Sequence, residues 1–400
     1  MKLRSPESFW LLKNGILKSY PSLKENIVCD IAVIGSGITG ALISHTLHNA
    51  GYKTLVLDKR DLASGSTSAT TSMLQYEIDT PLTDLAGLIG EMPAVECYKA
   101  GIRSIEILDN LVKSEKLKCG FELKKSLQVA HSKKAEVKLK EEFELRRKHG
   151  FNVEWLTSRE IRKRYKMIFY AGILSEEGAS VDAFQFAHEL IDNNHRKGMP
   201  VFDHTAIKKI DYNRENVVIY TELGNMVICR KVIFCSGFEA LYMFRKKYAD
   251  IVSTFACVSE QNINYYPELK DVLIWDTDNP YIYMRTTDDK RLLVGGEDVK
   301  FKYGGFSEKI KDEKANKLIR KIKNHFPNIN FTEDYNWSGA FGVTKDGLPY
   351  IGKHPDFRNA IFVLGLGGNG ITFSVQGMEL VLKILAGETD PLLHYYRFDR

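Results

Sequence analysis

Two glycine-rich stretches near opposite ends of the chain carry the strongest chemical signals in the sequence. "GSGITG" covers residues 35–40 and "GLGGNG" covers residues 365–370. Glycine has no Cβ, so it lets the backbone turn sharply or approach another group closely. Two such stretches could hold one long ligand, hold two ligands, or form two tight turns without a ligand.

The first stretch lies inside a βαβ pattern. The apolar run 31–34 predicts a buried strand, residues 40–50 predict a helix, and "KTLVLD" at 53–58 predicts a second strand. The turn between the first strand and the helix therefore carries the spacing G-x-G-x-x-G. Inside a unit of roughly 30 residues that closes with an acid, this spacing predicts a dinucleotide-binding turn.

Each glycine of this turn has its own part in such a site. Gly35 permits the turn, Gly37 lets a pyrophosphate approach the backbone, and Gly40 lets the helix and the strand pack closely. The free N–H groups at the helix start meet the phosphate charge. Asp58, at the end of the second strand, can bond the ribose hydroxyls, and an acid there disfavours a phosphorylated ribose.

A run of small and hydroxyl-bearing residues follows the second strand. It reads "DLASGSTSATTSMLQYE" over residues 61–77. A flexible surface linker can have this composition, but the run is short, contains no proline and includes apolar Met73 and Leu74. We therefore expect it to lie along a phosphate and a ring.

Length and composition exclude several classes of protein. A chain of 400 residues predicts two domains, and a net charge of +5 with only short basic runs argues against a nucleic-acid surface. No apolar run reaches the ~18 residues of a membrane span, and the N-terminus lacks the apolar core of a signal peptide. The six cysteines show no C-x-x-C pair and no metal-binding spacing. We expect a soluble, reduced, cytoplasmic protein without a metal.

The strand, the glycine turn, the acid and the following G-S-x-S-A-x-x-S-M-L run together resemble the D-amino-acid oxidase (DAO) family of FAD enzymes. The resemblance covers nearly the whole chain. Later segments that are similar to parts of that family are residues 178–210, 231–240, 284–298, 337–353 and 365–374.

The resemblance implies one long ligand, FAD, bound non-covalently, with its pyrophosphate at the first glycine turn and its isoalloxazine ring at the second. Sarcosine-type members attach the flavin to a cysteine where this chain has Gly339. The cofactor-binding residues that the resemblance implies are Gly35, Ser36, Gly37, Ile38, Thr39, Gly40, Asp58, Lys59, Ser66, Thr67, Ser68, Thr71, Ser72, Met73, Ile207, Ser236, Gly237, Gly342, Gly367, Gly368, Asn369, Gly370, Ile371 and Thr372.

The implied fold class is α/β, with a Rossmann-like FAD-binding domain and a second domain built on a mostly antiparallel sheet. The FAD-binding domain is expected at residues 27–85, 152–237 and 332–400. The substrate domain is expected at 86–151 and 238–331, after an N-terminal extension at 1–26.

The implied activity is oxidation of a C–N bond of a small amine or amino-acid derivative by hydride transfer to flavin N5. FAD supplies most of this chemistry, so the sequence need not show a general base. The alternatives are an FAD dehydrogenase of a hydroxy acid or polyol phosphate, a non-catalytic flavoprotein, and the oxidase half of a tRNA-modifying enzyme, which the missing partner domain disfavours. The electron acceptor, oxygen or another, and the oligomeric state stay open.

The candidate substrate-site residues are Met73, Tyr283, Arg285 and Phe341. Arg285 could face the cavity and bind an anionic group, or it could pair with Asp288 or Asp289. The tyrosines at 281 and 283 alternate with Ile282 and Met284, so one pair faces inward, but the pattern does not say which.

The chain departs from the family at its substrate-binding cations. Glycine oxidase-like members bind the substrate carboxylate through arginines where this chain has Phe341 and, nearby, Gly368; sarcosine oxidases use a lysine where it has Thr372, and another lysine, which assists oxygen, where it has Leu293. These departures predict an amine substrate without an α-carboxylate. The N-terminal segment 5–30 and "DDKRLLVGGED" are similar to the gamma-glutamylputrescine oxidoreductase branch.

Overall fold

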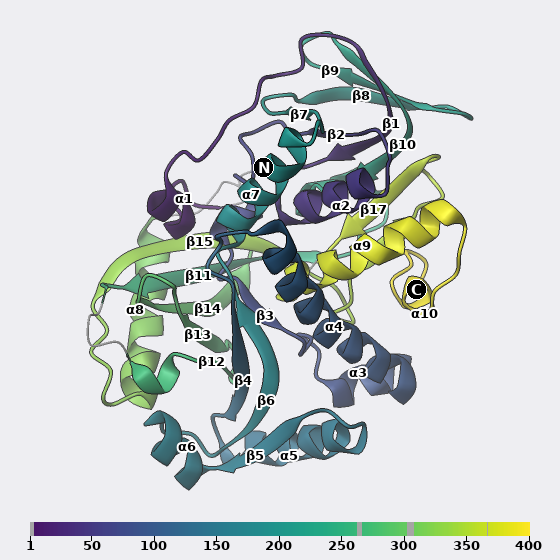
Figure 1. Cartoon of the computed structure of the whole chain (residues 1–400). Helices are drawn as coiled ribbons and strands as arrows, with labels where there is room; N and C mark the ends of the chain where they lie inside the picture. Colours follow the sequence, from purple (N-terminus) through teal and green to yellow (C-terminus); the bar gives the residue numbers. More distant parts are fainter. Residues whose placement is uncertain (1–3, 262–265, 302–307, 366) are drawn as a thin grey trace.

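Two large β-sheets form the framework of the protein in the computed structural model, which describes residues 4–261, 266–301, 308–365 and 367–400 (Figure 1). The first sheet has the strand order β16-β17-β10-β1-β2-β7, and a β8–β9 hairpin extends it from β10. The neighbours β1, β2, β7, β10 and β17 run parallel. The bounds are β1 (Ile27–Ile34), β2 (Thr54–Leu57), β7 (Val201–Phe202), β8 (Ile207–Tyr212), β9 (Val217–Thr221), β10 (Met226–Phe234), β16 (Tyr350–Lys353) and β17 (Ala360–Leu364).

Helices and loops cover both faces of the first sheet, which explains its continuous apolar strands. On β1, Ile31 and Val33 pack into the core beneath the helices, while Ala32 faces a second, aromatic-rich core that includes Phe362 and Phe398. The covering helices are α2 (Ile38–Asn49), α7 (Ala183–Arg196) and α9 (Gly370–Ala386), and α2 contacts the other two. This confirms the βαβ unit that the sequence predicts.

The second sheet is mostly antiparallel, as expected, and has the order β15-β11-β14-β13-β12-β4-β6-β3, with β5 paired to β6. Its parallel pair is β12 with β4. The bounds are β3 (Met73–Gln75), β4 (Glu122–Ala130), β5 (Val153–Thr157), β6 (Ala171–Ser180), β11 (Asp250–Ser259), β12 (Val272–Asp276), β13 (Ile282–Thr286), β14 (Leu292–Lys300) and β15 (Glu333–Val343).

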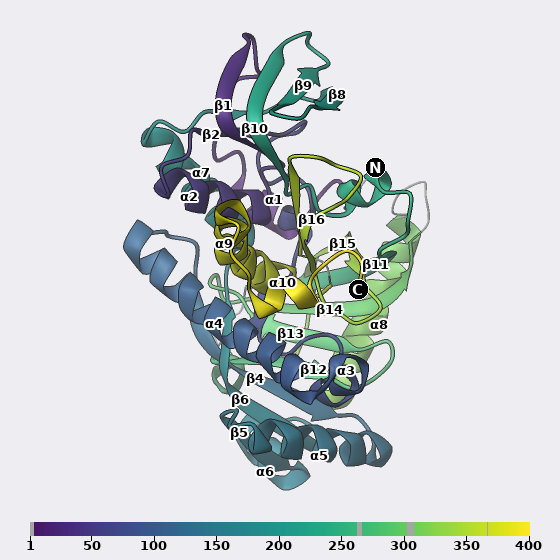
Figure 2. The ribbon, with the colours of Figure 1, turned by 90° about the vertical axis from the view of Figure 1, so that its right-hand side faces the viewer.

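Helices pack around the second sheet (Figure 2). Helix α8 contacts β11, β14 and β15, and its Leu318 and Ile322 share a core with Ile282 and Met284 of β13. The remaining elements are α1 (Phe9–Asn14), α3 (Leu82–Ile89), α4 (Glu91–Glu115), α5 (Lys133–Lys148), α6 (Ser158–Tyr165), α8 (Glu308–His325), α10 (Pro391–Tyr395) and the short 3₁₀ segments η1 (Ser66–Ala69), η2 (Gly237–Met243) and η3 (Pro267–Leu269).

Four strands of the second sheet come from segments expected in the FAD-binding domain. Strands β3, β5, β6 and β15 fall within the segments 27–85, 152–237 and 332–400, yet they belong to the second sheet. The sequence pattern cannot show this, because an apolar strand reads the same in either sheet. The three segments expected in the FAD-binding domain therefore also contribute strands to the second sheet.

The segment that follows β2 is held in place by three buried N–H donors. The carbonyl oxygens of residues 69, 70 and 71 each accept one hydrogen bond, from Trp337 Nε1 at 2.8 Å, Trp10 Nε1 at 2.6 Å and Arg285 Nε at 2.7 Å. The donors come from β15, α1 and β13. We call this set the carbonyl clamp. It fixes the hydroxyl-rich segment against the second sheet and the N-terminal extension.

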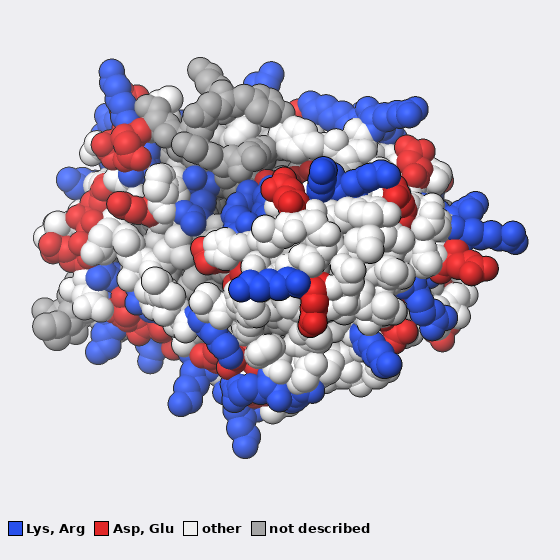
Figure 3. All heavy atoms as spheres, turned by 90° about the horizontal axis from the view of Figure 1, so that it is seen from above, with Lys and Arg blue, Asp and Glu red and all other residues white. Residues whose placement is uncertain are grey.

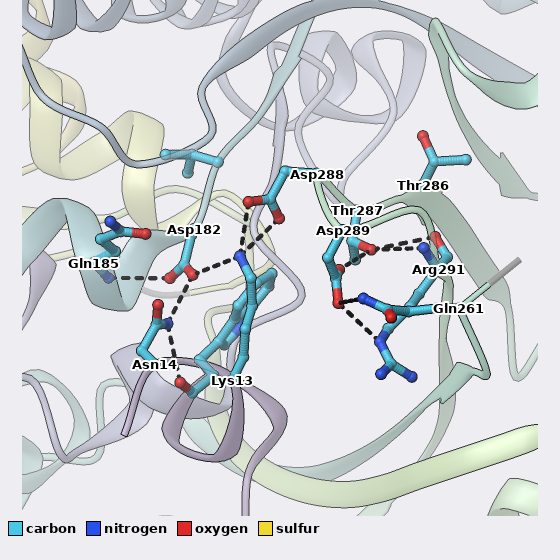
Figure 4. A network of polar contacts seen from close by, with 12 residues as sticks. Lys13, Asn14, Asp182, Gln185, Gln261, Thr286, Thr287, Asp288, Asp289 and Arg291 are labelled. Carbon is cyan, nitrogen blue, oxygen red and sulfur yellow. Dashed lines mark hydrogen bonds and ion pairs between the residues drawn. The ribbon is translucent and has the colours of Figure 1, made fainter. Parts of the chain in front are cut away.

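A polar network anchors the N-terminal helix that supplies Trp10 (Figure 4). Lys13 Nζ lies 3.2 Å from Asp182 and 2.7 Å from Asp288, and Asn14 also donates to Asp182. Farther along the same hairpin, Arg291 Nε donates to Asp289. Both acids that could have paired with Arg285 are thus bound to other cations.

The surface shows no block of one charge on the face in Figure 3, where basic and acidic side chains alternate around an uncharged area. A nucleic-acid surface needs a clustered basic footprint, which this face lacks. None of the helices in the described ranges combines the length and the apolar character that a bilayer crossing needs.

Arg285→Met should destabilise the protein strongly, because it removes the donors to three backbone carbonyls, those of Thr71, Val181 and Thr286. We expect the free energy of unfolding, measured in urea, to fall by about 3 kcal/mol. The matched control is Arg245→Met at an exposed position, where the change should stay within about 0.5 kcal/mol. Equal stability of the two variants would show that the clamp does not support the fold.

Candidate active site

A cavity of about 1570 Å³ lies between the two sheets and is lined by residues of both. Ligand pockets for small molecules usually measure about 300–1,000 Å³. The larger volume suits a long ligand together with a second, smaller one. Both glycine-rich stretches line this cavity, so the structure brings the two ends of the chain to one site.

The first glycine turn forms one end of the cavity, and its glycines are sterically required. Gly35 has φ +105°, and a Cβ there would lie 2.7 Å from the carbonyl oxygen of Cys235. A Cβ on Gly40 would lie 1.8 Å from the Gly35 oxygen, so the helix and the turn pack too closely there for a side chain. A Cβ on Gly37 would lie 2.9 Å from Thr67 Oγ1, within the space where β1 ends and α2 begins.

The acid after β2 orients the same turn. Asp58 accepts hydrogen bonds from the Ser36 amide at 2.8 Å and the Ser36 hydroxyl at 2.7 Å, and its other oxygen accepts from the Arg60 amide. The Thr67 hydroxyl accepts from the Ile38 amide at the start of α2. The carboxylate lines the cavity at the end of the strand, where the expected ribose contact requires it.

Most residues expected to bind the cofactor line the cavity. They are Gly35, Gly37, Ile38, Thr39, Asp58, Lys59, Ser66, Thr67, Thr71, Met73, Ile207, Ser236, Gly237, Gly367, Gly368, Asn369, Gly370 and Ile371. The space behind the turn, the helix N-terminus and the acid fit a dinucleotide such as FAD.

Six expected residues lie outside the lining and support it instead: Ser36, Gly40, Ser68, Ser72, Gly342 and Thr372. Ser68 donates to the Gly65 carbonyl, and Thr372 donates to the Asn369 carbonyl at the start of α9. The Gly342 carbonyl accepts from the Gly367 amide at 2.7 Å. The sequence pattern places these positions next to the cavity, but it cannot tell a residue that contacts a ligand from one that supports the lining.

The second glycine loop is tied to the segment after β3 by reciprocal hydrogen bonds. Asn369 donates to the carbonyls of Gln75 and Glu77 and accepts from the Asp79 amide, and the Asp79 carboxylate accepts from the Gly368 amide at 2.7 Å. The Asn369 side chain is therefore committed to the protein. Residue 366 of this stretch lies outside the described residues.

Strand β13 settles which side chains face the cavity. Tyr281 and Tyr283 line it, while Ile282 and Met284 are buried beneath α8. Arg285 does not line it and takes neither of its two expected roles: it is 3% exposed, its donors meet backbone carbonyls, and it lies 5.4 Å from the Trp10 ring centroid. Burial lowers the pKa of Arg285 to about 10.

The other substrate-site candidates do reach the cavity. Phe341 on β15 and Met73 on β3 both line it, with Thr254 of β11 nearby in the lining. Leu293 lies outside the lining, in the core beside α1. No group of three or more potential metal ligands occurs among the described residues.

The sequence did not predict a group of acids at the end of the cavity that the second sheet lines. We call this group the acidic wall. Glu77, Asp79, Asp276 and Asp298 form it, from three separate parts of the chain. Burial, together with the nearby charge of Asp79, raises the pKa of Asp298 to about 6, and burial also raises the pKa of Glu77, Asp79 and Asp276. Asp79 is exposed and lines the open cavity.

The geometry of the glycine turn, the helix N-terminus and the acid fits a dinucleotide-binding enzyme. The DAO family model, described as FAD dependent oxidoreductase, matches residues 30–381. The chain therefore belongs to the DAO family of FAD-dependent oxidoreductases.

Three known proteins show the range of similarity. The chain is 23% identical over 397 residues to the "Putative Rieske 2Fe-2S iron-sulfur protein YhfW" of Bacillus subtilis, covering 97% of this chain and 74% of that protein. It is 23% identical to the gamma-glutamylputrescine oxidoreductase of Escherichia coli, with 93% and 87% covered. The structure of glycine oxidase from Geobacillus kaustophilus matches with a TM-score of 0.77 at 20% identity, with 91% and 96% covered.

Gly37→Val should abolish FAD binding, because a branched side chain enters the space between the turn and Thr67 that a pyrophosphate needs. We expect the purified variant to be folded by circular dichroism but colourless. Gly87→Val is the matched control, since its Cβ meets nothing within 4 Å, and it should keep its yellow colour. Full flavin content in Gly37→Val would mean that the turn does not bind the cofactor.

The cofactor should be released by acid, because we expect it to be non-covalent. Gly339 is buried against Ala69, and the six cysteines are all buried, with only Cys235 among them lining the cavity, beside Gly35. Precipitation with trichloroacetic acid should leave the yellow colour in the supernatant. Colour retained in the washed pellet would contradict this expectation.

Proposed function

We propose that this FAD-dependent oxidoreductase oxidises a C–N bond of a small amine that has no carboxylate next to the reacting carbon. The observation that carries the proposal is the charge of the second-sheet end of the cavity. Among the described lining residues there, eight carboxylates occur with one basic residue, Lys138, which is exposed. A bare amino acid would place its carboxylate there without a cation, at a cost of several kcal/mol.

The positions where related enzymes carry their substrate-binding cations support the same conclusion. Phe341 presents an aromatic ring to the cavity, Thr372 lies outside the lining, and Gly368 donates its amide to Asp79. Arg285 could have bound a substrate carboxylate in place of the missing cations, but its guanidinium donates to backbone carbonyls instead. An apolar wall at Phe341 suits the alkyl chain of an amine.

The names of the relatives indicate oxidation of amines and amino acids. Their names include gamma-glutamylputrescine oxidoreductase, glycine oxidase and monomeric sarcosine oxidase, each 23–24% identical to this chain. From these names we infer that the substrate carries an amine. From the negative charge of the cavity we infer that it is not an amino acid.

The chain's own residues have distinct parts in such a reaction. The turn at residues 35–39, with Asp58, would hold the nucleotide half of FAD, and the loop at 367–371 would hold the ring half. Bound FAD would supply the electron acceptor, taking a hydride from the carbon next to the amine nitrogen. The N-terminus of α9 favours negative charge beside that loop, and Phe341 with Tyr283 would orient the alkyl chain.

We further propose that the first sheet carries the FAD-binding part and the second sheet the substrate-binding part. Oxygen or another acceptor would take the electrons afterwards. An anionic substrate, such as a hydroxy acid or a polyol phosphate, is disfavoured by the same acidic lining that disfavours amino acids.

Anaerobic flavin bleaching tests the proposal directly. Glycine, sarcosine and D-alanine should reduce the flavin at least tenfold more slowly than a primary alkylamine such as butylamine at equal concentration, and lactate and glycerol 3-phosphate should not reduce it. Rapid bleaching by glycine at millimolar concentration would refute the amine assignment. Bleaching by lactate or glycerol phosphate alone would assign the enzyme to hydroxyl oxidation.

A further inference from the structure

The charges along the cavity are strongly polarised between its two ends. The first-sheet end carries Lys59, Arg60, Lys208 and Lys209, next to only two acids, Asp58 and Glu239. The second-sheet end has the opposite balance, with the eight carboxylates described above. A dianionic pyrophosphate matches the first end, and a cation matches the second.

Two carboxylates and two phenol rings meet beside the second glycine loop. Asp79 is bound to the Gly368 amide, and its charge acts on Asp298, Tyr281 and Tyr283. The two tyrosine rings lie 5.6 Å apart between centroids, at 37° to each other. We call these four residues the loop-side acidic pocket. Carboxylates with aromatic faces are the usual partners of an ammonium group.

Some carboxylate oxygens here have no partner. Within the part of the chain that the structure describes, Oδ1 of Asp298, Oε2 of Glu77 and Oδ2 of Asp276 accept no hydrogen bond. Glu77 and Asp276 are each 3% exposed, and both line the cavity. A buried carboxylate oxygen without a donor is costly, and a cation in the adjacent cavity would offset that cost by its charge.

The protein's own cations reach only part of this wall, and they reach it from behind. Arg146 lies behind the wall, 3.5 Å from Glu77 Oε1, and is also bound to Glu142. Lys314 and Lys321 reach Glu297, and Lys321 also reaches Asp278, but neither lysine lines the cavity. The acidic wall therefore keeps an excess of negative charge toward the open space.

We propose that the substrate carries, besides the amine that reacts, a second ammonium group, which the loop-side acidic pocket binds. The substrate class is thus a diamine or polyamine. This inference rests on the proposed amine oxidation and narrows its substrate class. Glu77 and Asp276 extend the acidic wall beyond the pocket, so a longer polyamine finds further carboxylates there.

The carboxylates of the loop-side acidic pocket suit the ammonium group of the substrate that is not oxidised. An amine must lose its proton before it can be oxidised, since its lone pair has to be free. A neighbouring carboxylate favours the protonated form and raises the pKa of the amine. Asp79 and Asp298 would therefore hold a spectator ammonium well, whereas the neutral reacting nitrogen is better placed against an uncharged group such as Phe341.

The test uses the holoenzyme and matched pairs of amines with equal chain lengths. Half-saturating concentrations for anaerobic flavin reduction are measured for propylamine to hexylamine and for 1,3-diaminopropane to 1,6-diaminohexane. At one chain length or more, the diamine should half-saturate at a concentration at least tenfold below that of the monoamine. Equal half-saturation at every length would overturn the proposal while leaving amine oxidation intact.

Variants assign the effect to the pocket. In Asp298→Asn and Asp79→Asn, the ratio between monoamine and diamine half-saturation should fall to about one. Asp250→Asn, at an exposed position on β11, is the matched control and should keep the wild-type ratio. If Asp298→Asn instead lowers the maximal rate for both amines equally and keeps the ratio, Asp298 acts in proton transfer and the proposal is wrong.

A second readout needs no turnover. Tetramethylammonium cannot be oxidised to an imine, and its titration into the oxidised holoenzyme should shift the visible flavin spectrum with saturation. The shift should require at least tenfold more titrant in Asp298→Asn. If no amine bleaches the flavin but this shift is present, the proposed oxidation fails and the cation site stands. If the shift is absent or unchanged in the variant, the cation site fails.

Discussion

The carbonyl clamp is the constraint on which the site depends. The backbone of the hydroxyl-rich segment has no regular partner strand at residues 69–71, so its carbonyls must find donors elsewhere. Trp337, Trp10 and Arg285 supply them from three elements that are far apart in sequence. The clamp joins the second sheet and the N-terminal extension to the segment that follows β2. Without it, one long wall of the cavity would have no fixed position.

The sequence allows the local parts of the site to be predicted, because they follow from short patterns. A strand, a glycine turn, a helix and an acid within one unit of chain specify the first end of the cavity, and the steric demands at Gly35 and Gly40 agree with that prediction. Which face of a strand meets a cavity does not follow from a short local pattern. Tyr283 and Arg285 lie on the same side of β13, but only Tyr283 is open, because α1 covers its neighbour. That cover comes from residues more than 270 positions earlier in the chain.

The acidic wall could not be predicted for the same reason. Glu77 and Asp79 follow β3, Asp276 ends β12 and Asp298 lies on β14. Each is an ordinary charged residue in its local context, and only the strand order of the second sheet brings them to one surface. Strands β3, β5, β6 and β15 come from segments expected in the FAD-binding domain and yet pair in the second sheet, because local patterns identify a strand without naming its sheet. Topology, rather than local sequence, decides the character of the substrate space.

Asn369 has a consequence that reaches across the cavity. Its side chain bonds the backbone at three positions of the segment 75–79, while Asp79 bonds back to the loop through Gly368. The loop that would hold the ring half of the cofactor and the carboxylate that faces the substrate space thus form one hydrogen-bonded unit. If a ligand on one side of this unit shifts it, the free energy of binding on the other side changes. Thermodynamic linkage makes this effect equal in both directions. With the substrate bound as proposed, cofactor and substrate affinities would then be coupled quantities, to be measured with the occupancy of the other site stated.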